Sequence, residues 1–287
     1  MIRLAVRVAR PDAEAVLAEL LALAPGGLEE RDVDERTVEY VLYGAAGELP
    51  DLGDVRAAAG TALVDVSATE LPDADWREQW KAFHAPVDAR GPAGAVRVRP
   101  PWGEPAATGI DLVIEPGQAF GTGAHHTTRL CLALLLDLEP GGSFADWGCG
   151  SGVLAVAAAR LGYAPVAACD HDPLAVAATE AAAAANGAPG IAVTRVDLRR
   201  EPGPHAATVC ANLVGPLLLD VARRLQRPPG RLIVSGLLRE EAGAVAAAFG
   251  PHGLREAARR EAGEWSALLL RTGGDGPRSG RRSHRPG

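Results

Sequence analysis

The chain has 287 residues, 47% hydrophobic and 23% charged, and a formal net charge of −7. This length indicates roughly two domains that can bury a substantial core. No stretch is apolar over the length that a membrane helix needs, and the N-terminus lacks the features of a signal peptide, so we expect a cytoplasmic protein.

The cysteines do not favour a metal site. They are widely spaced, without a C-x-x-C pair, and they lie in apolar stretches: Cys131, Cys149, Cys169 and Cys210. We therefore expect small buried side chains in a reducing compartment and no bound metal.

Residues 1–70 predict a small α+β domain of the ferredoxin-like kind. Alternating apolar residues predict strands at 2–8, 37–43 and 62–66, and helical patterns lie between them at 11–23 and 49–59. This segment holds 6 arginines against 14 acidic residues, a net charge of −8. Such a surface suits a basic protein partner better than a nucleic-acid backbone, although an ordinary solvated acidic surface explains the count equally well.

Residues 71–109 are expected to connect two domains. Trp76, Trp80 and Phe83 recur at the spacing of one helix face, a pattern typical of packing between domains. A bend rich in proline and glycine then precedes a strand at 96–99.

Residues 110–271 alternate between strand and helix, which predicts a parallel sheet with helices on both faces. The expected strands lie near 143–146, 165–170, 191–197, 207–213 and 231–237. The expected helices lie near 127–138, 152–161, 174–186, 216–226 and 239–249. Two strand-like runs around Gly263 predict a terminal antiparallel hairpin. The basic tail, 272–287, is expected to be a disordered solvated extension rather than an RNA-binding segment.

A glycine-rich turn follows the first strand of this domain. Asp146 is followed by Gly148, Gly150 and Gly152 at alternate positions, and the next strand delivers Asp170 to its carboxyl end. A turn without Cβ atoms lets the backbone approach a nucleoside, and a carboxylate at the second strand end binds ribose hydroxyls. The order of strand, glycine turn, helix, strand and acid therefore predicts a nucleoside site, the alternative being a turn that serves packing alone.

The glycine spacing selects the nucleoside. A dinucleotide fingerprint requires glycine at the sixth position of the motif, where this chain has Val153. The shorter motif, with an acidic residue two positions ahead of it, suits S-adenosylmethionine, which carries no pyrophosphate. Asp146 is then expected to attract the ammonium group of the methionine moiety, unless it serves only the strand end.

Asn212 is the candidate catalytic residue. It ends the fourth strand, at the sheet edge where ligands of open α/β sheets bind. Its carbonyl would accept a hydrogen bond from an attacking amine and point the nitrogen lone pair at the methyl group. The alternative is that Asn212 caps the following helix.

A second segment, which comes before the glycine turn in the chain, contains two glycines around a threonine. It leads into the helix expected near 127–138. Gly121 and Thr122 are expected to belong to a loop that closes over the cofactor. Thr128, in the first helical turn, can meet a carboxylate, although Thr127 or Thr128 can equally be the N-cap. His125 is a candidate base for an incoming amine, with hydrogen bonding within the loop as the alternative.

This segment, Glu115-Pro-Gly-Gln-Ala-Phe-Gly-Thr-Gly-Ala-His-His-Thr-Thr128, resembles the P-G-x-A-F-G-T-G-x-H-x-T-T signature of the PrmA family. These are S-adenosylmethionine-dependent methyltransferases that act on ribosomal protein L11. Further blocks resemble the family in the same order, including Asp75–Phe83, the glycine turn, Asp170–Pro173, Ala211–Leu213, Ser235–Leu238 and Glu264-Trp265.

The resemblance implies a Rossmann-like class I methyltransferase domain and methylation of lysine ε-amines, with an N-terminal α-amine as a further acceptor. It also implies cofactor contacts at Phe120, Gly121, Thr122, Thr128 and Asn212. The chain departs from the family pattern at Ala207, where an acidic residue is usual, and at His126, where proline is common. Two alternatives therefore stay open, a methyltransferase with another protein or small-amine substrate and a catalytically silent cofactor-binding regulator.

Overall fold

The computed structural model describes residues 2–23, 28–44, 49–70, 85–116 and 125–273. Residues 2–70 form one compact unit, and residues 86–115 and 125–273 form another. The helix expected at 75–84 and the tail at 274–287 lie outside the described residues. No helix of the described part is long and apolar enough to cross a membrane.

The first unit is a four-stranded antiparallel sheet with the strand order β2-β3-β1-β4. Its elements are β1 (Ile2–Ala9), the 3-10 turn Arg10–Asp12, α1 (Ala13–Leu23), β2 (Glu29–Asp32), β3 (Thr37–Gly44), α2 (Leu52–Ala59), the 3-10 turn Gly60–Ala62 and β4 (Leu63–Glu70). This β-α-β-β-α-β order is that of a ferredoxin-like domain. Strand β2 was not predicted, because its sequence, EERD, is charged and lacks alternation between polar and apolar residues.

A three-stranded sheet opens the second unit. It contains β5 (Val87–Gly91), β6 (Gly94–Arg99) and β7 (Ile110–Val113) in that order. Val96, Val98 and Leu112 are buried in the core cluster that includes the first helix of this unit, α4 (His126–Leu136). Ala93 N–H also donates to the carbonyl of Leu136 at 2.9 Å. Residues 86–109, which we expected within the connecting segment, therefore pack as part of the second unit.

The main sheet has seven strands in the order β10-β9-β8-β11-β12-β14-β13. They are β8 (Phe144–Trp147), β9 (Val166–Asp170), β10 (Ala192–Arg195), β11 (Thr208–Asn212), β12 (Arg231–Leu238), β13 (Leu254–Ala262) and β14 (Trp265–Thr272). The first five are parallel, and β13 and β14 form the antiparallel hairpin that the sequence predicted. The predicted parallel sheet is therefore confirmed.

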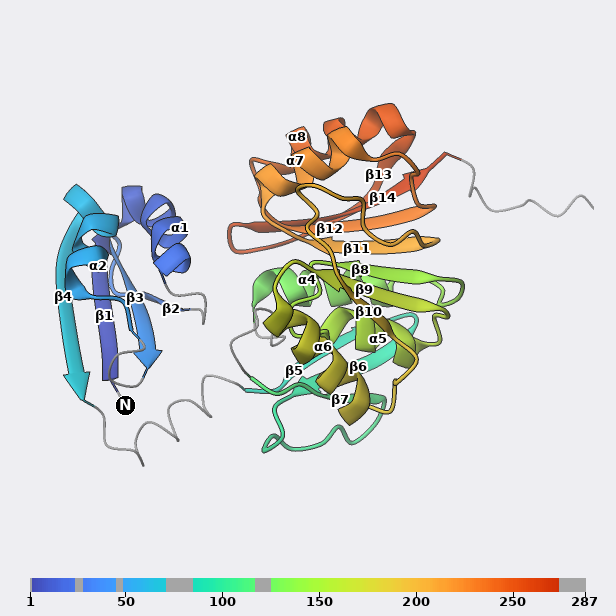
Figure 1. The fold of residues 1–287 in the computed structure, drawn as a ribbon, viewed down its shortest axis with the longest axis horizontal. Coiled ribbons are helices and arrows are strands. Elements are labelled where there is room, and N and C mark those ends of the chain that lie inside the picture. Colours follow the sequence, from blue (N-terminus) through green and yellow to red (C-terminus); the bar gives the residue numbers. More distant parts are fainter. Residues whose placement is uncertain (1, 24–27, 45–48, 71–84, 117–124, 274–287) are drawn as a thin grey trace, which may run out of the picture. The chain divides into compact units, whose positions relative to one another are not determined.

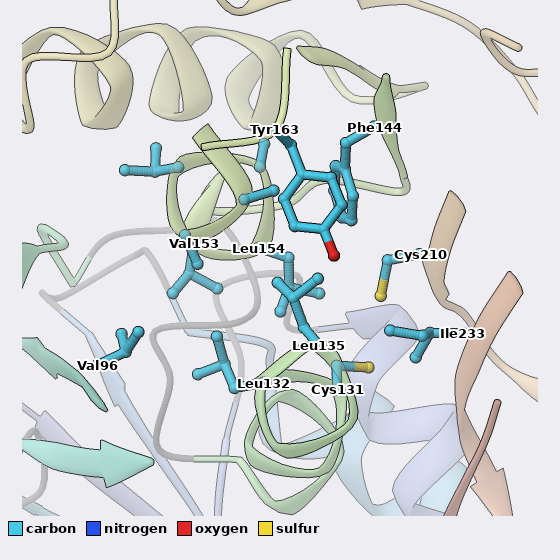
Figure 2. Close-up of a cluster of buried hydrophobic side chains, with 14 of the residues drawn as sticks. Val96, Cys131, Leu132, Leu135, Phe144, Val153, Leu154, Tyr163, Cys210 and Ile233 are labelled. Atoms are coloured by element: carbon cyan, nitrogen blue, oxygen red, sulfur yellow. The ribbon is translucent and has the colours of Figure 1, made fainter. Parts of the chain in front are cut away.

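Helices cover both faces of this sheet (Figure 1). α4, α5 (Val153–Leu161) and α6 (Pro173–Ala185) pack on one face, and α7 (Gly215–Arg224) and α8 (Ala242–Phe249) pack on the other. In the first layer, Leu132 and Leu135 of α4 belong to one buried cluster with Phe144 of β8 and Ile233 of β12 (Figure 2). Chain order reverses between β8 and β11, so the carboxyl ends of these strands form the topological switch point at which open α/β sheets bind ligands.

Candidate functional site

Three predicted side chains lie at the carboxyl edge of neighbouring strands. Asp146 lies in β8, Asp170 ends β9 and Asn212 ends β11. Because β8 pairs with both β9 and β11, the strand order itself places these residues around the switch point. The strand order thus brings residues from separate sequence motifs together in one site.

The glycine turn has a backbone that other residues rarely adopt. Gly148, Gly150 and Gly152 have φ angles of 75°, 51° and 80°, all in the left-handed region. A Cβ on Gly152 would lie 2.8 Å from Cα of Thr179, so close packing of α5 against α6 also requires glycine here. Thr179 Oγ1 donates to the carbonyl of Gly150 at 3.1 Å, which fixes the turn. The three glycines are therefore required by the shape of the turn.

The carboxylate of Asp170 is tied to the glycine turn. Its Oδ2 accepts a hydrogen bond from Gly150 N–H at 3.1 Å, and its Oδ1 accepts one from Asp172 N–H at 3.0 Å. The side chain is 12% exposed and lies 3.1 Å from Nδ1 of His171. Asp170 thus lies at the carboxyl end of β9, as predicted, and its hydrogen bonds stabilise the turn.

Asp146 is fully buried beneath the first turn of α5. Its Oδ2 accepts a hydrogen bond from Ala155 N–H at 3.0 Å, whereas its Oδ1 has no hydrogen-bond partner among the described residues. Burial, aided by the nearby charge of Asp170 and opposed by the Ala155 hydrogen bond, raises the pKa of Asp146 to about 7. A buried carboxylate oxygen without a partner suits a cationic ligand group, as the ammonium of S-adenosylmethionine would supply.

The raised pKa of Asp146 gives a prediction for the variant Asp146→Asn. The folded protein retains a proton that the unfolded chain releases, so the stability from this proton is complete below about pH 4 and is lost as pH rises through about 7. The variant cannot ionise. Its melting temperature is therefore expected to rise relative to the wild type between about pH 5 and pH 8.

Thermal unfolding of both proteins without cofactor, measured across this pH range, checks the prediction. Other titrating groups, including His125, are common to both proteins and cancel in the difference. A difference in melting temperature that stays constant with pH would contradict the raised pKa.

Asn212 meets Thr128, which lies 84 residues earlier in the chain. Asn212 Nδ2 donates to Thr128 Oγ1 at 3.4 Å, and Thr128 is buried in the first turn of α4. The carbonyl oxygen Oδ1 of Asn212 is buried without a hydrogen-bond partner in the described part of the chain. The N-cap of α7 is Val214, so the alternative reading of Asn212 as that cap is wrong. The amide is oriented by Thr128 and keeps an acceptor for an incoming N–H.

His125 caps α4, a role that we had considered for Thr127 or Thr128. Its Nδ1 lies 3.3 Å from Thr127 N and 2.8 Å from Thr127 Oγ1, and its ring packs edge-on against Trp265 at 5.1 Å between centroids. Burial, with a smaller contribution from His126, lowers the pKa of His125 to about 4. A base this weak does not deprotonate a lysine near neutral pH, so the contacts favour hydrogen bonding within the loop.

Comparison with known proteins identifies the family. The sequence profile described as "Ribosomal protein L11 methyltransferase (PrmA)" matches residues 32–272. The chain belongs to the PrmA family. It is therefore a methyltransferase, and the predicted family resemblance is confirmed.

Relatives and a solved structure agree with this family. A ribosomal protein L11 methyltransferase of Pelotomaculum thermopropionicum is 41% identical over 213 residues, 72% of this chain and 68% of that protein. One of Myxococcus xanthus is 34% identical over 262 residues, 85% of this chain and 89% of that protein. A crystal structure of a ribosomal protein L11 methylase from Lactobacillus delbrueckii subsp. bulgaricus matches with a TM-score of 0.55 and 28% identity, covering 62% of this chain and 95% of that one.

One departure from the PrmA pattern lies away from the site. Ala207 precedes β11, and its N–H donates to Oγ of Ser143 at 2.8 Å. Asn212 lies at the opposite end of the strand, about 16 Å away at the usual rise per residue. The missing acidic residue therefore does not remove a group from the switch point.

Two further groups of residues complete the description of this PrmA site. Phe120, Gly121 and Thr122 lie outside the described residues, so their cofactor contacts remain predictions. Asn186 was not predicted from the sequence. Its side-chain amide accepts a hydrogen bond from Val113 N–H and donates one to the Val113 carbonyl, both at 2.7 Å. This amide holds the end of β7. No cluster of metal-ligating side chains occurs in the described ranges.

Proposed function

We propose that the chain transfers the methyl group of S-adenosylmethionine to lysine ε-amines of ribosomal protein L11, with an N-terminal α-amine as a further acceptor. The observation that carries this proposal is the unpartnered, buried Oδ1 of Asn212 at the switch point of a PrmA-family fold. An oriented acceptor at this place can position an amine. Since the proposed substrate belongs to the ribosome, the reaction would take place in the cytoplasm.

The residues present fit the cofactor. S-adenosylmethionine supplies a methyl group on a positively charged sulfur, which an uncharged amine can attack in line. We assign the ribose hydroxyls to Asp170, the methionine ammonium to Oδ1 of Asp146, and the carboxylate to Thr128 and the first turn of α4. The backbone of the glycine turn leaves room for the nucleoside.

Catalysis is assigned mainly to alignment. Asn212 Oδ1 accepts an N–H of the acceptor amine, and Thr128 holds the amide in place from the other side. Orientation of reactants can contribute roughly 7–11 kcal/mol, so no covalent intermediate is needed. His125 is not assigned the role of base, because a pKa near 4 leaves it unable to hold a proton taken from lysine.

The test is the intact mass of purified ribosomal protein L11 after incubation with the enzyme and S-adenosylmethionine. We expect a series of single-methyl increments that is lost with the Asp170→Ala variant when the cofactor concentration lies well below the dissociation constant of that variant. An unmodified substrate, with a folded wild-type enzyme that binds cofactor, would favour a different methyl acceptor. An enzyme that binds no cofactor would contradict the proposal as a whole.

The acidic N-terminal unit is proposed to dock the basic protein substrate. A chain that begins at residue 86 retains β5–β7 and is expected to bind cofactor with a dissociation constant within about twofold of the full chain. Its kcat/KM on ribosomal protein L11 is expected to fall by about 10²-fold, because the second contact surface is lost. Steady-state kinetics and calorimetry measure the two quantities.

A chain that begins at residue 110 is the control. It lacks β5 and β6, uncovers buried core residues and is expected to lose stability and cofactor binding together. Equal activity of the full chain and the chain from residue 86 would contradict docking by the N-terminal unit.

A further inference from the structure

Val214 stands where a helix cap normally requires a polar residue. It is the N-cap of α7, with φ −61° and ψ 147°, and no side-chain hydrogen bond caps the helix. Serine, threonine, aspartate and asparagine are preferred at this position because their oxygens accept free N–H groups of the first turn, and valine is among the least favourable residues. Valine at this position therefore stabilises α7 less than one of these polar residues would.

The same side chain is also exposed. Val214 is 63% exposed, and among the described residues of the second unit the other strongly exposed large hydrophobic residue is Leu174, at 55%. Both follow strands at the carboxyl edge of the sheet, in the segments after β11 and β9. An apolar side chain that gains neither burial nor a cap breaks a local rule, and such departures concentrate at functional positions.

The segment that carries Val214 is held firmly beside Asn212. Leu213 N–H donates to the carbonyl of Ser235 at 2.9 Å. A Cβ on Gly236 would lie 3.1 Å from Oδ1 of Asn212, and one on Gly215 would lie 2.6 Å from a carboxylate oxygen of Glu241. Close packing on both sides fixes Val214 two residues from the candidate catalytic amide.

We propose that Val214 determines specificity by contacting the methylene stem of the acceptor lysine while Asn212 positions its amine. This inference rests on the proposed function and deepens it. A lysine stem has four carbons and gains from an apolar contact, whereas a short polar amine does not. The contact accounts for both the exposed position and the absence of a polar cap.

Val214→Thr is the decisive variant, because threonine has nearly the shape of valine but can cap α7. Its melting temperature is expected to rise by about 2–4 °C, and its KM for ribosomal protein L11 to rise about three- to tenfold. The dissociation constant for S-adenosylmethionine and kcat are expected to stay within about twofold. Val214→Ile, the control, keeps the apolar contact and is expected to retain the wild-type KM and melting temperature.

A higher melting temperature together with weaker substrate recognition distinguishes this role from a structural one. If Val214 had only a structural role, its replacement would lower both the stability and the substrate recognition. If the wild-type enzyme methylates the protein and Val214→Thr has the same KM, the inference on Val214 is overturned and the proposed function stands. A variant that loses stability as its KM rises would also overturn it. A wild-type enzyme that does not methylate the protein would overturn the proposed function and, with it, the acceptor named here.

Discussion

Replacing Asn212 with alanine is expected to lower kcat on ribosomal protein L11 about a hundredfold. The substitution removes the oriented carbonyl that accepts an N–H of the attacking amine, and misalignment of a reactant by about 1 Å can cost this much. The fold should persist, because the hydrogen bond from Nδ2 to Thr128 Oγ1 is long, at 3.4 Å. Methyl transfer at saturating cofactor, followed by intact mass, measures the effect.

Thr128 supplies the matched control. Thr128→Val removes the hydroxyl that orients the Asn212 amide but keeps the shape of the side chain, so we expect a fall in kcat of about tenfold. Thr128→Ser keeps the hydroxyl and should retain most of the turnover. Unaltered turnover in Asn212→Ala would remove this residue from the mechanism, and equal kcat values for the two Thr128 variants would remove the orienting hydrogen bond.

Local patterns were sufficient to predict the glycine turn and the place of Asp170 at the end of the next strand. The left-handed glycines at 148, 150 and 152 and the acidic residue at 170 belong to one β-α-β unit, so their relation is set by consecutive elements. Alternation of strands and helices likewise predicted the parallel sheet and its terminal hairpin. Strands β2, β5 and β7 were missed because they are short and because charged, proline-rich or glycine-rich sequence hides their pattern.

Contacts between distant segments could not be predicted in the same way. The pairing of Asn212 with Thr128 joins two elements whose approach depends on how α4 packs over the sheet. Asn186 forms hydrogen bonds with both the N–H and the carbonyl of Val113. The only sign of this in the sequence is a polar residue at the end of an alanine-rich helix. The raised pKa of Asp146 depends on complete burial, which tertiary packing decides.

Replacing Asp170 with alanine is expected to weaken S-adenosylmethionine binding by roughly 1.5–3 kcal/mol, about a ten- to hundredfold rise in the dissociation constant. The carboxylate would lose its hydrogen bonds to the ribose. It also holds Gly150 N–H and Asp172 N–H, so part of the effect could come from a loosened turn. Isothermal titration calorimetry of the wild type and the variant gives the change in binding.

Asp170→Asn separates the two contributions, because the amide oxygen can still accept one backbone N–H while the charge is lost. We expect an intermediate dissociation constant and a smaller fall in melting temperature than for alanine. Removing the charge also relieves its repulsion of Asp146, so the pKa of Asp146 should move down from about 7 and the pH dependence of stability should weaken. An unchanged dissociation constant in both variants, with reduced stability, would mean that Asp170 holds the glycine turn and takes no part in binding ribose.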